Sequence, residues 1–362
     1  MGPAIERITG SAYTVPTESP ESDGTLEWDY TTIVIAEAEA GGTSGLGYTY
    51  SHETVAKLVQ TTLSKAVEGR DAFDVTGAWE AMVTAIRNLG RPGMCSMAIA
   101  AVDVALWDLK ARLLGVPLVS LLGGIRDRVA IYGSGGFTSY SVDQLCEQLG
   151  GWAQSGIEMV KMKVGREPQQ DVERVRAARA SLGDNVELFV DANGAYERRQ
   201  ALAKTEAFAE AGVTWFEEPV SSDDLEGLRM LRDSAAGSMD IAAGEYGYDL
   251  FYFNRMLEAG AVDVLQADAT RCAGITELMR VDALCRARSV PLSAHTAPAL
   301  HLHPCCAAES VRHIEYFHDH VRIERILFDG VVEPDRGGLH PDMTRPGTGL
   351  ELKRADAEPY AA

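Results

Sequence analysis

Two lysines, Lys161 and Lys163, stand two residues apart inside the short apolar run 160–164 (VKMKV). A period of two is that of a β-strand, so both lysines share one face. A helical pattern over 171–182 and an apolar run over 186–190 follow, and this alternation predicts a parallel sheet covered on both faces. A like-charged pair in a covered strand costs free energy and needs a chemical reason, whereas an exposed edge strand carries it harmlessly. The run alone leaves both interpretations open.

Carboxylates end three later apolar runs, at Asp191, Glu217 and Glu245. A lone aspartate at such a junction is as well explained as a helix N-cap, but glutamate is a poor N-cap. Three carboxylates that converge repel one another, and a divalent cation relieves the repulsion. Oxygen-only ligands select a hard ion and leave positions for water or substrate. We therefore assign these three residues to a metal ion, Mg²⁺ in preference to Mn²⁺ or Ca²⁺.

Two further strand ends carry Asp268 and His295. Asp268 near His295 would orient the imidazole and raise its pKa, as an acid–base pair needs. Lys161 beside Lys163 should lower a lysine pKa by like-charge repulsion, which makes a usable base. A satisfied core histidine is the alternative for His295, but its position at a strand end opposite the lysines favours chemistry.

The elements that would position these residues form a repeating pattern after about residue 125. Helical segments alternate with apolar runs at a spacing of roughly 20 to 30 residues, which is the pattern of a closed (β/α)8 barrel. In such barrels the catalytic groups lie at the C-terminal ends of the strands. The eight predicted strands end near Gly133, Lys163, Asp191, Glu217, Glu245, Asp268, His295 and Glu315.

The first 50 residues predict a different, strand-rich unit. Runs 5–15 and 31–39 are rich in β-branched and aromatic residues. The polar run 16–24 between them is too long for a hairpin turn, so we expect a flexible surface loop or a mobile lid. We also expect a Gly-rich loop over 41–50. Helices follow, and Leu121-Leu122-Gly123-Gly124 resembles a domain boundary.

Composition narrows the classes of function. The 362 residues carry a formal net charge of -20, which disfavours nucleic acid and anionic membranes as partners. The 6 cysteines show neither a C-x-x-C pair nor zinc-like spacing. Scattered thiols without a recognisable secretory leader predict the cytoplasm. No apolar run approaches the roughly 18 residues of a membrane span.

Taken together, these residues resemble the enolase superfamily, specifically the mandelate racemase-like subgroup (the mandelate racemase/muconate lactonizing enzyme family). The resemblance covers nearly the whole chain and extends to the run 101–110 and the boundary at 121–124. The matching pieces at the site are Lys161-Met162-Lys163, Asp191-Ala192-Asn193-Gly194, Trp215-Phe216-Glu217-Glu218-Pro219, Ala243-Gly244-Glu245, Gln266-Ala267-Asp268 and Ser293-Ala294-His295.

The resemblance implies a fold and a chemistry. The fold would be an α+β capping domain over 1–124, a modified (β/α)8 TIM barrel over 125–329, and a C-terminal segment over 330–362 that returns to the capping domain. The chemistry would be Mg²⁺-dependent abstraction of the proton α to a carboxylate, through an enediolate intermediate. Lys163 would be one base and His295, paired with Asp268, the other, while Lys161 would neutralise the substrate carboxylate.

Further residues follow from the resemblance or from their positions. Glu315 would be a carboxylic acid that hydrogen-bonds the developing oxyanion, which requires a raised pKa; a surface glutamate is the alternative. Candidate substrate contacts are Asn193, Ser134, Tyr48, Tyr50, His52 and Arg271. For the histidines near the end of the barrel, we favour a solvated or pocket-lining cluster over a second metal site. These histidines are His301, His303, His313, His318 and His320.

The reaction itself stays open at this point. We favour dehydration of an acid sugar, with racemisation or epimerisation of a 2-hydroxy acid second and cycloisomerisation of a sugar lactone third. A second-lysine variant is disfavoured because Asp268 is followed by Ala269-Thr270-Arg271. Other classes are a catalytically silent barrel acting as a binding or scaffold protein and a metal-dependent hydrolase. The expected partners are a small carboxylate substrate and further copies of the chain in an even-numbered homo-oligomer, such as a dimer or octamer.

Overall fold

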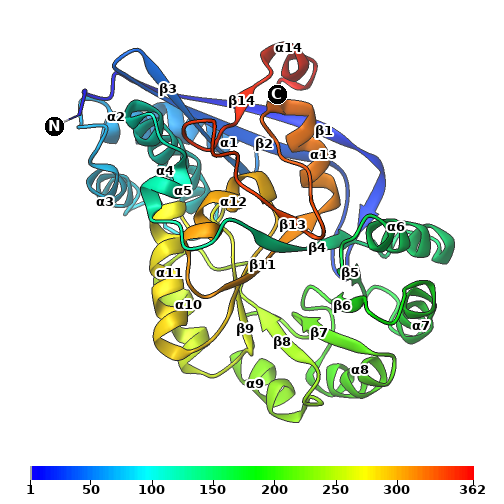
Figure 1. The fold of residues 1–362 in the computed structure, drawn as a ribbon. Helices are drawn as coiled ribbons and strands as arrows, with labels where there is room; N and C mark the ends of the chain where they lie inside the picture. Colours follow the sequence, from blue (N-terminus) through cyan, green and yellow to red (C-terminus); the bar gives the residue numbers. More distant parts are fainter. Residues whose placement is uncertain (1) are drawn as a thin grey trace.

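The computed structural model describes residues 2–362, which form an antiparallel sheet with helices next to a closed barrel (Figure 1). The sheet has the order β1-β2-β3. Its strands are β1 (Arg7–Ser22), β2 (Glu27–Ala40) and β3 (Thr43–Tyr50), and the helical segments after it are α1 (Thr54–Leu58), η1 (Val59–Leu63), α2 (Ser64–Val67), α3 (Val75–Ala85), α4 (Met94–Leu114) and α5 (Leu118–Leu122).

Eight parallel strands form the barrel, and pairing of the last with the first closes it, which confirms the predicted modified (β/α)8 barrel. They are β4 (Val129–Gly135), β5 (Met159–Lys163), β6 (Glu187–Asp191), β7 (Val213–Glu217), β8 (Asp240–Ala243), β9 (Val264–Ala267), β10 (Leu292–Ala294) and β11 (Val311–Phe317). The helices around them are α6 (Val142–Gln154), α7 (Asp171–Ser181), α8 (Arg198–Glu210), α9 (Leu225–Ser234), α10 (Leu250–Glu258), α11 (Ile275–Arg288), α12 (Pro298–Ala307) and α13 (His318–Leu327). Tyr132, Phe189 and Trp215 fill the barrel interior.

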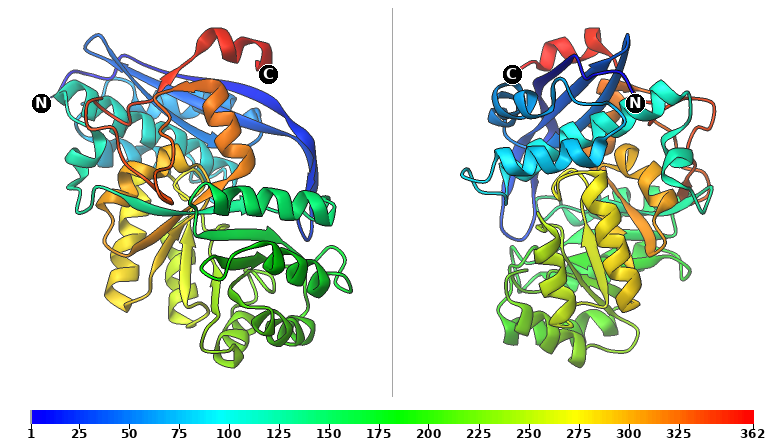
Figure 2. Two further views of the ribbon diagram at one scale, coloured as in Figure 1. Left: turned by 45° about the vertical axis from the view of Figure 1, so that its right-hand side comes forward. Right: turned by 90° about the vertical axis from the view of Figure 1, so that its left-hand side faces the viewer.

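The predicted loop over 16–24 is wrong for most of its length. Residues up to Ser22 continue strand β1, and its pairing with β2 resumes after a register shift between Pro16 and Glu21. Pro16 is tolerated because β1 is the edge strand of the sheet. Figure 2 shows the resulting β1–β2 hairpin extending from the sheet down to the barrel. Part of the expected lid is therefore a docked strand pair.

The predicted Gly-rich loop over 41–50 is also wrong, because its residues form strand β3 after a tight turn. Gly41 and Gly42 make that turn with φ values of 55° and 73°. Gly45 and Gly47 lie against α4, where an added Cβ would stand 2.3 and 2.2 Å from backbone oxygens of that helix. The glycines serve close packing of helix on sheet rather than a flexible loop.

Buried polar contacts join the capping sheet and its helices to the loop that follows β9 and to the first turn of α11. Asp103 of α4 accepts hydrogen bonds from the backbone N–H and the hydroxyl of Thr276, at 2.9 and 2.6 Å. Thr49 of β3 donates to the Thr270 carbonyl oxygen at 2.7 Å. This loop begins at Asp268, so the cap fixes one side of the barrel mouth.

The C-terminal residues contact both parts. Strand β13 (Gly338–Leu339) pairs with β4, and β14 (Glu351–Leu352) pairs with β12 (Phe328–Asp329). The last residues, after α14 (Arg354–Ala357) and η2 (Glu358–Tyr360), reach the capping sheet, where the Ala362 N–H donates to the Ala12 carbonyl at 3.0 Å. Among residues 2–362, no helix is both long and apolar enough to cross a membrane.

Candidate active site

Three carboxylates converge at the C-terminal ends of neighbouring barrel strands. Asp191 ends β6, Glu217 ends β7 and Glu245 follows β8; all three are buried, and one oxygen of each lies within 4.8 Å of the others. The Trp215 indole donates to Glu217 Oε2 at 3.0 Å and fixes that side chain. Three converging carboxylate oxygens form a donor set that fits a hard divalent cation such as Mg²⁺.

The two lysines of β5 point into the same region. Lys161 Nζ contacts Glu217 Oε1 at 2.6 Å and Asp191 Oδ2 at 3.3 Å, and Lys163 Nζ lies 2.5 Å from Asp191 Oδ2. The expectation of a lowered lysine pKa is wrong for this arrangement. Burial and the charge of Lys161 lower the pKa of Lys163, but the carboxylates of Asp191, Glu315 and Glu245 together outweigh them, so the net shift is upward.

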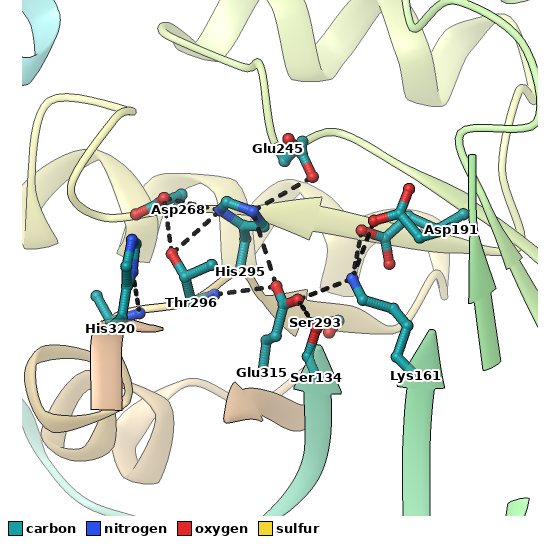
Figure 3. Close-up of polar contacts among 12 residues, drawn as sticks. Ser134, Lys161, Asp191, Glu245, Asp268, Ser293, His295, Thr296, Glu315 and His320 are labelled. Carbon is teal, nitrogen blue, oxygen red and sulfur yellow. Dashed lines mark hydrogen bonds and ion pairs between the residues drawn. The ribbon is translucent and has the colours of Figure 1, made fainter. Parts of the chain in front are cut away.

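His295 and Asp268 form a buried pair on the other side. The His295 Nδ1 lies 2.9 Å from Asp268 Oδ2, and its Nε2 lies 3.2 Å from Glu245 Oε2 (Figure 3). Burial lowers the pKa of His295, but Glu245, Glu315 and the bond to Asp268 raise it to about 9. Asp268 thus holds one ring nitrogen, while the other points toward the triad.

Glu315 of β11 lies between Lys161 and His295 in the site. Its oxygens receive bonds from Ser134 Oγ at 2.6 Å and from the Thr296 N–H at 3.2 Å, and Lys161 Nζ lies 2.9 Å away (Figure 3). The expectation that its pKa is raised is wrong here: burial raises the pKa, but Lys161 and His295 lower it well below its ordinary value. Glu315 is therefore ionised in this arrangement.

A cavity of about 410 Å³ lies at the barrel mouth, and Lys163, Glu245, His295 and Glu315 are in its wall. Four of the predicted substrate contacts also line it: Asn193, Tyr50, His52 and Arg271. Arg271 contacts Glu245 Oε1 at 3.2 Å and the Tyr246 ring at 5.1 Å. Ser134 is buried behind Glu315, as its 2.6 Å bond to that side chain shows.

Lys161, another predicted substrate contact, is fully buried beside the triad and does not line the cavity, whereas Tyr48 lies away from the site. The Tyr48 ring is buried against Phe328, and its hydroxyl donates to Glu324 Oε1 at 2.5 Å. It therefore belongs to the core between β3 and α13. Its neighbour along the strand, Tyr50, instead stacks on His320 in the cavity wall, with ring centroids 3.4 Å apart.

The expected histidine cluster is also wrong for three of its members. His301 accepts from the Ala269 N–H at 2.8 Å, His303 accepts from the Val119 N–H at 3.2 Å, and His313 Nδ1 bonds Ser293 Oγ at 2.9 Å. All three are buried as ordinary core histidines. Within residues 2–362, the one cluster arranged to hold a metal is the carboxylate triad.

Sequence reasoning missed several residues of the cavity wall, including Thr296, Trp28 and Tyr246. Trp28 was missed because no strand was predicted over residues 25–30, so its place in β2 was not recognised. Thr296 follows His295 with a positive φ of 50°, a conformation that the sequence does not signal. The motif Trp215-Phe216-Glu217 did carry a signal for the indole bond to Glu217, since both side chains share the inward parity.

Fold and site together define a capped (β/α)8 barrel with a carboxylate metal triad between two basic groups. A family model described as the enolase C-terminal domain-like family matches residues 144–357. The mandelate racemase/muconate lactonizing enzyme N-terminal domain matches residues 17–123. The chain belongs to the mandelate racemase/muconate lactonizing enzyme family of the enolase superfamily.

Two similar proteins match this chain over nearly their full lengths. The 3,6-anhydro-alpha-L-galactonate cycloisomerase of Streptomyces coelicolor is 33% identical over 96% of this chain and 97% of its own. A mandelate racemase/muconate lactonizing enzyme-like protein from Rubrobacter xylanophilus has a solved structure with 58% identity and a TM-score of 0.98, covering 99% of this chain and 100% of its own.

A second similar structure carries a metal. The L-talarate/galactarate dehydratase of Salmonella typhimurium, solved with Mg and L-lyxarohydroxamate, has 29% identity and a TM-score of 0.91, covering 100% of this chain and 94% of its own. These comparisons make the chain a lyase or an isomerase of the enolase superfamily. Its buried carboxylate triad is suited to the same kind of ion.

Proposed function

We propose that this protein catalyses the Mg²⁺-dependent dehydration of an acid sugar, a polyhydroxylated carboxylic acid. The observation that supports this most is the approach of two basic groups to one carboxylate triad from different sides. Lys163 comes from β5 and His295 from β10, with four strands between them in one direction around the barrel and two in the other. Both side chains reach the cavity at the barrel mouth.

The reaction needs strong electrostatic help, because the proton α to a carboxylate is very weakly acidic. A general base alone supplies only about 10²- to 10⁴-fold. Asp191, Glu217 and Glu245 would hold Mg²⁺, whose positive charge would be concentrated where negative charge develops on the substrate. The ammonium of Lys161, fully buried beside the triad, adds a second fixed positive charge.

The chain's own groups then carry the protons. Lys163 must be neutral to act as a base, and a divalent ion at the triad would offset the carboxylate charges that raise its pKa. Lys163 then accepts the proton from C2, which leaves an enediolate. His295, held at Nδ1 by Asp268, donates its Nε2 proton to the hydroxyl at C3 as the C3–O bond breaks. A C2–C3 double bond forms and water leaves, and the enol product tautomerises to a 2-oxo acid. Each proton thus has a named donor or acceptor in the cavity wall.

The test is a screen of acid sugars and 2-hydroxy acids with the Mg²⁺-loaded protein in D₂O. We expect an acid sugar that yields a 2-oxo acid and exchanges its C2 hydrogen, both followed by NMR. Lys163→Ala should abolish both. His295→Asn should abolish dehydration but leave exchange of the proton that faces Lys163.

Matched controls are Lys57→Ala and His340→Asn, since both side chains are exposed and lie outside the cavity. Both variants should keep wild-type turnover. If no acid in the screen is dehydrated or exchanges its C2 hydrogen, the proposed reaction is wrong. Dehydration by His295→Asn at the wild-type rate would assign the general acid to another residue.

Cycloisomerisation of a sugar lactone or anhydro acid is the second candidate. It is favoured by the 33% identity to a cycloisomerase over 96% of this chain. Proton abstraction would be the same, but the leaving oxygen would belong to a ring, so the product keeps the mass of the substrate. Mass spectrometry on the same screen separates the two reactions, because dehydration removes one water.

A further inference from the structure

Glu21 is a buried carboxylate close to the cavity that plays no part in the proton transfers. It is only 1% exposed and lies near the end of β1. Its register partner across the hairpin is Trp28 of β2. The Trp28 indole N–H donates to Glu21 Oε2 at 3.0 Å, and the Trp28 ring lines the cavity. A buried acid is therefore bonded directly to an aromatic wall of the substrate site.

The backbone at this end of the hairpin is held in place by the loop after β4. The Thr138 N–H donates to the Ser22 carbonyl at 2.8 Å, the two hydroxyls lie 2.6 Å apart, and Thr138 Oγ1 donates to the Asp23 carbonyl at 2.8 Å. Gly24 fits against Ala192, where an added Cβ would stand 2.3 Å from the backbone oxygen. These contacts fix the backbone of the hairpin end, but they do not fix the orientation of the Trp28 indole.

Two contacts set that orientation. One is the bond to Glu21, and the other is an edge-on contact with Phe137, with ring centroids 5.7 Å apart at 90°. We propose that Glu21 is a positioning residue that holds the Trp28 ring as the wall against which the carbon chain of the substrate packs. The proposal rests on the proposed function, because it assumes that an acid sugar occupies this cavity. The C–H face of such a chain is complementary to an aromatic ring.

The surroundings of Glu21 add a pH dependence. Four titratable or charged groups face it: Glu18 on its own strand, Asp319 and Arg322 on α13, and Tyr140 in the loop after β4. Burial and the Asp319 carboxylate raise the pKa of Glu21 to about 8, whereas the Trp28 bond and Arg322 lower it.

Arg322 does not neutralise Glu21, because it bonds Asp319 Oδ1 at 2.7 Å and the Pro16 carbonyl at 2.6 Å. Glu21 is therefore neutral at pH 7. Above about pH 8 it becomes a second buried anion beside Asp319. The repulsion should move the Glu21 side chain, together with the indole bonded to it, while the backbone contacts to Thr138 stay in place. Substrate binding then weakens without a change in the proton-transfer groups.

The test compares Glu21→Gln, which stays neutral and keeps an acceptor, with Trp28→Phe, which keeps a ring and removes the donor. Glu18→Gln is the matched control, because Glu18 lies on the same strand but pairs at the surface with His318. KM and kcat of the Mg²⁺-loaded enzyme are measured at each pH from about 6.5 to 9.5. The indole N–H of Trp28 is followed by NMR in the same Mg²⁺-loaded proteins.

We expect the wild-type KM to rise above about pH 8 and to stay flat in Glu21→Gln, with kcat alike in both. Trp28→Phe should raise KM about three- to tenfold at pH 7, the effect of one lost hydrogen bond, with kcat within about twofold. The wild-type Trp28 N–H signal should titrate near pH 8, and the Glu21→Gln signal should not. Glu18→Gln removes only the most weakly acting of the charges around Glu21, so it should keep the wild-type rise of KM with pH.

The positioning role is overturned if Glu21→Gln keeps the wild-type pH dependence of KM, or if Trp28→Phe lowers kcat and leaves KM unchanged. The NMR titration needs no substrate, so it decides the Glu21–Trp28 coupling even if the screen finds no acid sugar. If the screen finds no substrate but the Trp28 signal titrates, the proposed reaction is wrong and the Glu21–Trp28 coupling still holds. A Trp28 signal that does not respond to pH would refute the coupling itself.

Discussion

Removal of one triad carboxylate should remove most of the stabilisation that Mg²⁺ gives to the fold. Glu245→Gln keeps the size of the side chain and removes its charge from a triad whose oxygens lie within 4.8 Å of one another. An ion that binds the folded chain at 100 times its Kd stabilises it by about 2.7 kcal/mol. Loss of a residue that only hydrogen-bonds to a metal ligand lowers metal affinity by about 10- to 100-fold. Loss of a direct ligand should lower it by at least as much.

These numbers translate into melting temperatures. Unfolding entropy of about 2.1 cal/mol/K per residue gives about 0.8 kcal/mol/K for 362 residues, so 2.7 kcal/mol corresponds to a rise of about 3–4 °C. If the affinity of Glu245→Gln falls about 100-fold, the ion is then at its Kd, which leaves about 0.4 kcal/mol and a rise of about 0.5 °C.

The assay is calorimetry of each variant with EDTA and then with Mg²⁺, so that each protein is its own reference. Glu309→Gln is the matched control, because Glu309 is an exposed carboxylate paired with Arg286 away from the barrel mouth. Its Mg²⁺ shift should equal that of the wild type. An equal shift in Glu245→Gln and the wild type would refute the assignment of the ion to this triad.

Three further outcomes follow from specific contacts. Lys163→Met removes the ammonium 2.5 Å from Asp191, so the Mg²⁺ shift in calorimetry should persist or grow while C2 exchange is lost. Burial raises the pKa of Glu324 to about 8. Between about pH 4.5 and 8, this carboxyl group is therefore more often protonated in the folded state than in the unfolded state. Its contribution to stability should fall as pH rises through that window, and Glu324→Gln should remove the fall in urea titrations. Gly45→Ala places a Cβ 2.3 Å from the Ala105 carbonyl and should lower the free energy of unfolding by about 1–3 kcal/mol.

The sequence predicted the barrel and its strand ends because both depend on local pattern. An apolar run that ends in Asp191 or Glu217 places that side chain by strand parity alone, and parallel strands bring such ends together. The capping hairpin was not predicted, because Pro16 and the polar residues after it are typical of loops. Only pairing with β2 and docking on Thr138 make that segment a strand.

Protonation states were harder to predict than positions. Whether Lys163 or Glu315 is charged depends on distances of 2.5–2.9 Å to partners from other strands, and no local pattern fixes these. Tyr48 and Tyr50 share the parity of β3, yet one hydroxyl meets the buried Glu324 and the other ring meets His320. Both partners lie on α13, so the position along β3, rather than the alternation, separates the roles of the two tyrosines.

The charges at the barrel mouth also explain why an anionic substrate would need the cation. Five acidic side chains meet there against three basic ones and His295. The acids are Asp191, Glu217, Glu245, Asp268 and Glu315, and the basic residues are Lys161, Lys163 and Arg271. A carboxylate that entered this region alone would meet an excess of negative charge, whereas a divalent ion at the triad offsets it. A substrate carboxylate that then paired with Lys161 would compete with Glu315 for that ammonium. Since Lys161 is the main group that lowers the pKa of Glu315, this competition would raise that pKa toward the protonated form that hydrogen-bonds an oxyanion.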